Sequence, residues 1–125
     1  PDMRIPISFV LAYPDRISNS VKKLELGKVK KLTFFEPDLE KFPCLELAYE
    51  ALKIKKSAPT ILNAANEIAV DAFLTKKIKY LSIPKLVEKT LNKASISNVN
   101  SIKDVVEIDN SARQIAMSMV ISGKY

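Results

Sequence analysis

Apolar residues recur at helical spacing over most of the chain from Pro43 onward. Polar residues at Glu46, Glu50 and Lys53 follow steps of four and three, which leaves a wide apolar face between them. Pro43 suits the first turn of a helix, because the N–H that proline lacks has no helical partner there. The pattern therefore predicts an amphipathic helix that begins at about residue 43.

A second helix is predicted over residues 63–76 from the same kind of apolar stripe. Asn63 is a plausible N-cap, and Asn66 and Glu67 are placed to satisfy N–H groups of the first turn. We interpret these three polar residues as a buried capping network or a domain interface. Contact with a ligand is the alternative use of the same group.

Two later segments complete the helical pattern. One helix is predicted over 82–94, and a last one follows Ser101 and Asp104, whose spacing matches a capping box. Asp109 leaves open whether the last helix is continuous, and Gly123 is a fair C-terminal stop. Amphipathic helices joined by short links predict a mainly α fold, with a small C-terminal helical bundle.

The first forty residues show a different pattern. A short helix is predicted over 4–13, where Pro14 should end it. The short β-branched and aromatic run at 32–35 predicts an edge strand. A lone strand leaves its backbone groups unpaired, so we expect this one to belong to a missing α/β catalytic domain. We therefore divide the chain into 1–40, the end of that domain with a connector, and 41–125, the helical bundle.

The net charge and the cysteine content limit which functions the chain can have, but they do not identify one. The net charge is +6, from 20 basic and 14 acidic residues, and the lysines are spread along the chain. Nucleic-acid binders gather arginine and aromatics on one face, so a solvated lysine-rich surface is favoured. An independent basic helical module that binds nucleic acid or a protein remains the alternative. The single cysteine, Cys44, indicates a reducing compartment such as the cytoplasm, and its apolar neighbours predict a buried structural thiol.

Several kinds of active site are excluded within this sequence. It contains no histidine, one cysteine and two glycines. Zinc sites of the usual ligand sets and catalytic systems built on histidine therefore cannot form here. Glycine-rich dinucleotide or phosphate loops are also impossible. We expect no catalytic residue, no metal ligand and no cofactor bound by this chain alone.

Two pairs of segments together carry a family resemblance. The first pair is PDMRIPI at 1–7 and AYPDR at 12–16. The second is LTFFEPDLEKFPCLELAYEAL at 32–52 and LNAANEIAVDAFL at 62–74. In order and spacing they resemble the C-terminal third of the 1-deoxy-D-xylulose 5-phosphate reductoisomerase family.

The resemblance implies a reaction for the parent enzyme. Members rearrange deoxyxylulose phosphate and reduce the product with NADPH to 2-C-methyl-D-erythritol 4-phosphate, an early step of non-mevalonate isoprenoid synthesis. A divalent metal, Mg, Mn or Co, acts as the Lewis acid. The NADPH-binding and catalytic domains lie upstream and would be this chain's partners. We expect a homodimer, and neither nucleic acid nor a membrane as a partner.

The resemblance also places a few residues of this chain near function. In similar proteins the PDM segment borders the nicotinamide and the bound substrate, which points to Pro1 and Met3. Methionine is a soft apolar side chain suited to a ring face. The run at 32–35 would pair onto the catalytic sheet. The helical tail would be structural, bracing the catalytic domain through the segment from Asn63 to Glu67.

Overall fold

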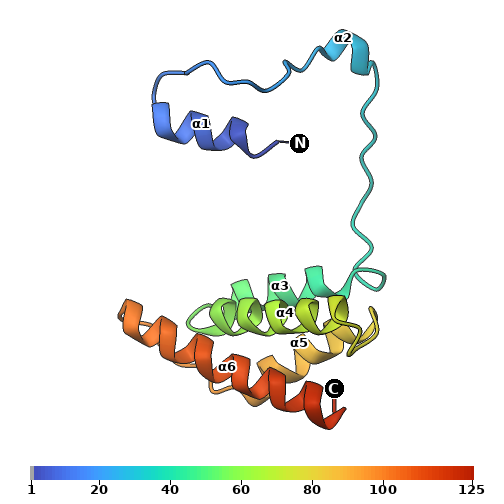
Figure 1. Ribbon diagram of the computed structural model, residues 1–125, viewed down its shortest axis with the longest axis vertical. Coiled ribbons are helices and arrows are strands. Elements are labelled where there is room, and N and C mark those ends of the chain that lie inside the picture. Colours follow the sequence, from blue (N-terminus) through green and yellow to red (C-terminus); the bar gives the residue numbers. More distant parts are fainter. Residues whose placement is uncertain (1) are drawn as a thin grey trace. The chain divides into compact units, whose positions relative to one another are not determined.

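The computed structural model describes residues 2–125, and the regular secondary structure in that range is six helices (Figure 1). The predicted mainly α fold is therefore confirmed. The chain divides into two compact units, the first ending at Glu36 and the second spanning Pro37–Tyr125. The predicted division after residue 40 lies a few residues beyond this boundary.

The first unit contains α1 (Arg4–Ala12) and the short α2 (Leu26–Val29). The predicted helix 4–13 is confirmed, and it ends one residue early because Tyr13 takes an extended backbone before Pro14. The Tyr13–Pro14 peptide bond is cis. Gly27 lies within α2.

The strand predicted for 32–35 does not form within the described chain, and its pairing with another domain stays a prediction. These residues form no ladder, and residues 2–125 contain no strand with which they could pair. A strand needs a neighbour for its backbone N–H and C=O groups, and the described chain supplies none. Phe34 and Phe35 are each 86% exposed, so this segment also lacks a packing partner within the chain.

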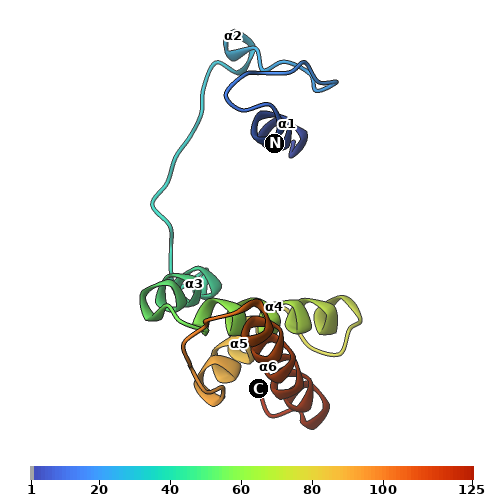
Figure 2. The ribbon, with the colours of Figure 1, turned by 90° about the vertical axis from the view of Figure 1, so that its left-hand side faces the viewer.

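The second unit is a four-helix bundle of α3 (Pro43–Ile54), α4 (Ala58–Leu74), α5 (Ser82–Lys93) and α6 (Ile102–Ser122). Helix α4 is central and contacts each of the other three. Figure 1 and Figure 2 show α3 along one side of α4, with α5 and α6 together on another side. The main core gathers buried residues of α4, α5, α6 and the α4–α5 loop: Ala65, Ala69, Ala72, Ile78, Ile83, Leu86, Val87 and Met119.

Small side chains bring the central helices together. The six buried residues of α4 are five alanines and Ile61. The buried residues of α6 are Ala112, Ala116 and Met119. Alanine lets two helix backbones approach closely, while larger side chains such as Leu86 fill the space beside the contact.

The start of α4 corrects one prediction. Helix α4 begins at Ala58, five residues before the predicted cap, so Asn63 lies inside the helix and is exposed. Pro59 lies in the first turn, where proline is favoured. The buried Ser57 hydroxyl accepts a hydrogen bond from the Ser97 backbone N–H at 2.9 Å. A tertiary contact therefore fixes this helix start, and Asn63 plays no part in capping.

The ends of α6 follow the sequence more closely. The Ser101 side chain accepts from the Asp104 backbone N–H, and Asp104 accepts from the Ser101 N–H, which completes the predicted capping box. The helix runs unbroken through Asp109 to Ser122. Gly123 follows in the left-handed conformation, with φ of 67°.

The exposure of Cys44 corrects another prediction. Cys44 is exposed, so the prediction of a buried thiol is wrong for the described chain. The residue lies in the first turn of α3, outside the core of the bundle.

Among the helices described, none combines the length and the apolar character needed to cross a bilayer.

Candidate functional site

The segment before α1 carries the residues predicted to border an active site. Pro1 lies outside the described residues, and its predicted role is not addressed by the structure. Met3 is the N-cap residue of α1 and is 71% exposed. Its thioether side chain is therefore largely open to solvent in the described chain.

Asp2 and Arg4 form an ion pair on either side of Met3. Arg4 Nε donates to both carboxylate oxygens of Asp2, at 3.0 and 3.2 Å, and Arg4 Nη2 donates to Oδ2 at 2.7 Å. The Arg4 backbone N–H also donates to Asp2 Oδ1 at 3.0 Å. The hydrogen bonds from the Arg4 side chain hold the pKa of the Asp2 carboxyl below its usual value.

The loop after α1 is tied back to that helix at three points. Arg4 Nη1 donates to Ser20 Oγ at 2.9 Å, and Asn19 Nδ2 donates to Ser8 Oγ at 3.0 Å. The Arg16 guanidinium lies 5.2 Å from the centre of the Phe9 ring, within the range of a cation–π contact. These contacts arrange the Met3 segment, α1 and the loop as one local unit.

Helix α1 is apolar but covers no core. Its sequence, RIPISFVLA, has no buried residue in the structure. Val10 and Leu11 are 72% and 78% exposed. An apolar helix of this kind is ordinarily packed against another element, because exposing apolar surface to water is unfavourable. The exposed residues of α1 therefore form a surface suited to contact with another domain.

The predicted group at Asn63, Asn66 and Glu67 has a different use from the expected cap. Asn63 Nδ2 donates to Glu67 Oε1 at 2.9 Å within α4. Arg113 of α6 donates to Glu67 Oε2 at 2.6 Å, and its Nε donates to Asp109 Oδ2 at 2.7 Å. Asn63 and Glu67 are exposed and Asn66 is half-buried, so no buried network exists. The contact instead links α4 to α6.

The contacts between Arg113 and Glu67 shift the pKa values of both groups. Hydrogen bonds from Arg113 and Asn63 hold the pKa of Glu67 below its usual value. In turn, the bonds to Asp109 and Glu67 raise the pKa of Arg113, which stays charged. The pair therefore stabilises the folded chain above the ordinary glutamate pKa of about 4.3. That stabilisation is lost as the pH falls through the lowered pKa of Glu67 in the folded state.

Replacement of Arg113 tests this link through its pH dependence. The variant Arg113→Gln is expected to unfold at lower urea concentration than wild type at pH 7. The difference should shrink as the pH falls from about 4.3 through the lowered pKa of Glu67 in the folded state. Urea titrations followed by circular dichroism at several pH values measure it. The control Lys103→Gln removes the same charge from an exposed 3.8 Å pair with Glu107 and should change little.

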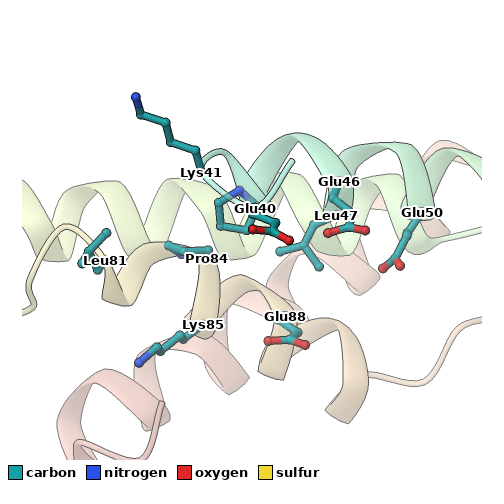
Figure 3. Close-up of a pocket in the computed structure, with 10 residues that line it drawn as sticks. Glu40, Lys41, Glu46, Leu47, Glu50, Leu81, Pro84, Lys85 and Glu88 are labelled. Atoms are coloured by element: carbon teal, nitrogen blue, oxygen red, sulfur yellow. The ribbon is translucent and has the colours of Figure 1, made fainter. Parts of the chain in front are cut away.

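A groove lies between α3 and α5 in the second unit. It holds about 490 Å³ and is lined by acidic, basic and apolar residues: Glu40, Lys41, Pro43, Glu46, Leu47, Glu50, Leu81, Pro84, Lys85 and Glu88. Figure 3 shows Glu46 and Glu50 on α3 across from Glu88 on α5, while Lys41 points away. Within residues 2–125, no three potential ligands from histidine, cysteine, aspartate or glutamate gather closely enough to hold a metal.

The fold and the site features place the chain in a broad class of protein. The chain is a helical domain with an uncovered apolar helix ahead of it and, in the described residues, no metal-ligand cluster. Its sequence matches the family model of the DXP reductoisomerase C-terminal domain over residues 1–115. The chain belongs to this family, as the resemblance predicted.

Relatives and solved structures agree with this family assignment. The chain is 48% identical over 120 residues to the 1-deoxy-D-xylulose 5-phosphate reductoisomerase of Acetivibrio thermocellus, covering 96% of this chain and 32% of that protein. It is 49% identical over 116 residues to that of Trichlorobacter lovleyi, covering 93% and 30%. The chain spans about a third of the length of the curated relatives it matches.

The same fold occurs in solved reductoisomerases. The enzyme of Zymomonas mobilis in complex with NADPH matches with a TM-score of 0.86 and 46% identity, over 96% of this chain and 32% of that one. A reductoisomerase in complex with magnesium matches with a TM-score of 0.84 and 37% identity, over 100% and 34%.

Proposed function

We propose that this chain is the C-terminal part of an enzyme that converts 1-deoxy-D-xylulose 5-phosphate to 2-C-methyl-D-erythritol 4-phosphate. NADPH supplies the reducing equivalent, and a divalent metal such as Mg, Mn or Co acts as the Lewis acid. The observation that carries the proposal is the match to the family domain over residues 1–115. The NADPH and magnesium complexes of structurally similar enzymes support the choice of cofactors.

The cofactor-binding groups are assigned to upstream domains of the same chain. Residues 2–125 fit a metal poorly, since no cluster of three ligands forms among them. The two glycines of the sequence also exclude a glycine-rich phosphate loop. The chain's own contribution is then structural, with Met3 bordering the nicotinamide and bound substrate. Its exposure and its soft thioether support that role.

The upstream domains are also the partners proposed for the uncovered apolar surface. Helix α1 and the segment 32–35 expose apolar side chains that a neighbouring domain would bury. The backbone at 32–35 is unpaired in the described chain and could add to the edge of an upstream sheet. The exposed α4 segment at Asn63 and Glu67 is proposed to face the same domains. We further propose a homodimer that works in the cytoplasm, where the exposed thiol of Cys44 stays reduced.

The full-length protein that contains this chain tests the proposal. It should oxidise NADPH when given deoxyxylulose phosphate with Mg²⁺ or Mn²⁺, and mass spectrometry should find methylerythritol phosphate. Omission of the metal should abolish turnover. Replacement of Met3 by alanine should raise the KM for NADPH, because an apolar contact to the ring is lost. A full-length protein without turnover that bound mixed DNA with strong salt dependence would favour the basic-module alternative instead.

A further inference from the structure

Arg4 occupies an unusual place in the first unit, because its guanidinium contacts both Asp2, next to Met3, and Ser20 in the loop after α1. One edge holds the Asp2 carboxylate through Nε and Nη2, at distances between 2.7 and 3.2 Å. The remaining nitrogen, Nη1, holds Ser20 Oγ at 2.9 Å. Met3 therefore lies inside a short ring of chain that the Asp2–Arg4 contact closes, and that ring is anchored to the loop after α1.

We propose that Arg4 is a positioning residue that fixes Met3 in place, by holding Asp2 and Ser20 at the same time. This inference rests on the proposed function, in which Met3 borders the nicotinamide. It adds a residue that does not itself need to touch substrate or cofactor. Its effect on the reaction passes through Met3.

The chemistry of arginine suits this double contact. The planar guanidinium presents several N–H donors in a fixed fork, so it can hold a carboxylate with one edge and a hydroxyl with another nitrogen. A lysine ammonium is a compact point charge on a flexible stem and lacks that geometry. Charge alone would therefore not replace Arg4, which gives the proposal a direct test.

Met3 is held at its backbone by α1, where its carbonyl accepts from the Ile7 N–H at 3.2 Å, while its side chain depends on how the neighbouring chain is arranged. Met3 is 71% exposed and belongs to neither core cluster of the bundle. The contacts of Arg4 with Asp2 and Ser20 join the segment before Met3 to the loop after α1. A misplacement of about 1 Å in a positioning group can cost up to about a hundredfold in rate. If the Met3 segment becomes more mobile, the KM for NADPH should therefore rise measurably.

The experiment compares variants of the full-length enzyme in steady-state kinetics. Arg4→Gln and Arg4→Lys are each expected to raise the KM for NADPH by about tenfold, while the KM for deoxyxylulose phosphate stays within about twofold. Asp2→Asn and Ser20→Ala each remove one contact and should give smaller increases. Lys22→Gln, an equal loss of charge in the same unit, is the matched control and should leave both constants unchanged.

The decisive comparison joins Arg4→Gln with Met3→Ala. If Arg4 acts through Met3, the double variant should have the same KM for NADPH as Met3→Ala alone, because effects on one shared group do not add. Additive effects would overturn the inference and leave Arg4 with a merely structural role. Full rescue by Arg4→Lys would also overturn it, because charge alone would then suffice.

The remaining outcomes separate the inference from the proposed function. A raised KM in Met3→Ala with normal kinetics in Arg4→Gln overturns the role of Arg4 alone. Normal kinetics in Met3→Ala overturns the roles of both residues while the enzyme assignment stands. A wild-type protein without turnover overturns the proposed function itself. Thermal unfolding of every variant is measured in parallel, and if Arg4→Gln unfolds early, Asp2→Asn and Ser20→Ala in the Met3→Ala background decide the question.

Discussion

The 125-residue chain by itself is expected to consume no NADPH when given deoxyxylulose phosphate and Mg²⁺ or Mn²⁺. Metal catalysis of this kind needs several ligands at one place, and residues 2–125 gather no such cluster. The absence of histidine and the presence of only two glycines leave no ordinary phosphate or dinucleotide loop. Proximity of cofactor, metal and substrate supplies much of an enzyme's rate acceleration, and the chain lacks the means to create it.

The full-length protein is the positive control for this prediction. Both proteins are assayed at equal molar concentration by the fall in NADPH absorbance, with metal added and with chelator. The full-length protein should turn over and the 125 residues should match the buffer blank. Metal-dependent turnover by the shorter chain would refute the assignment of the chemistry to upstream residues. It would also remove the main support for a purely structural role of the bundle.

Local signals in the sequence were enough to predict most of the helices. Pro43 at the first turn of α3 and the capping box of Ser101 and Asp104 mark helix starts by chemistry that acts within a few residues. Gly123 ends α6 because glycine readily takes the left-handed backbone. The spacing of apolar residues predicted the other helices, because it indicates the face that each helix buries.

The predictions that the described chain does not bear out all concern features that depend on partners distant in the sequence. The start of α4 is set by Ser57, whose hydroxyl contacts the Ser97 backbone 40 residues away. Asn63 looked like a cap because its side chain favours that position, but local preference lost to this contact. The run at 32–35 has the composition of a strand, yet a strand forms only with a neighbour. Burial of Cys44 likewise depended on which face of α3 meets the bundle.

In the candidate site, contacts between residues close in sequence were predictable, while contacts between distant residues were not. Asp2 and Arg4 are close in sequence, so an ion pair between them could have been anticipated from the PDMR motif. The contact of Arg4 with Ser20 closes a loop of 16 residues, and the contact of Glu67 with Arg113 joins residues 46 apart. No spacing rule predicts such pairs. The link between α4 and α6 was therefore visible only in the folded chain.

Leu86→Ala is expected to destabilise the bundle strongly. Leu86 is fully buried, with 0% exposure, in the core shared by α4, α5 and α6. Removing a buried leucine loses apolar transfer energy and leaves a cavity that neighbours fill only in part, at a cost of about 3 to 5 kcal/mol. A small domain is stabilised by only about 5 to 15 kcal/mol, so the variant should lose a large share of its stability.

Leu74→Ala is the matched control, because the same atoms are removed from an exposed site. Leu74 is the last residue of α4 and is 71% exposed, so its truncation should change the free energy of unfolding by about 0.5 kcal/mol or less. Urea titrations of both variants and wild type, followed by circular dichroism, measure the difference. Equal losses at the two positions would contradict the packing described for α5. That result would mean that Leu86 contributes no more to the stability of the bundle than a leucine exposed to water.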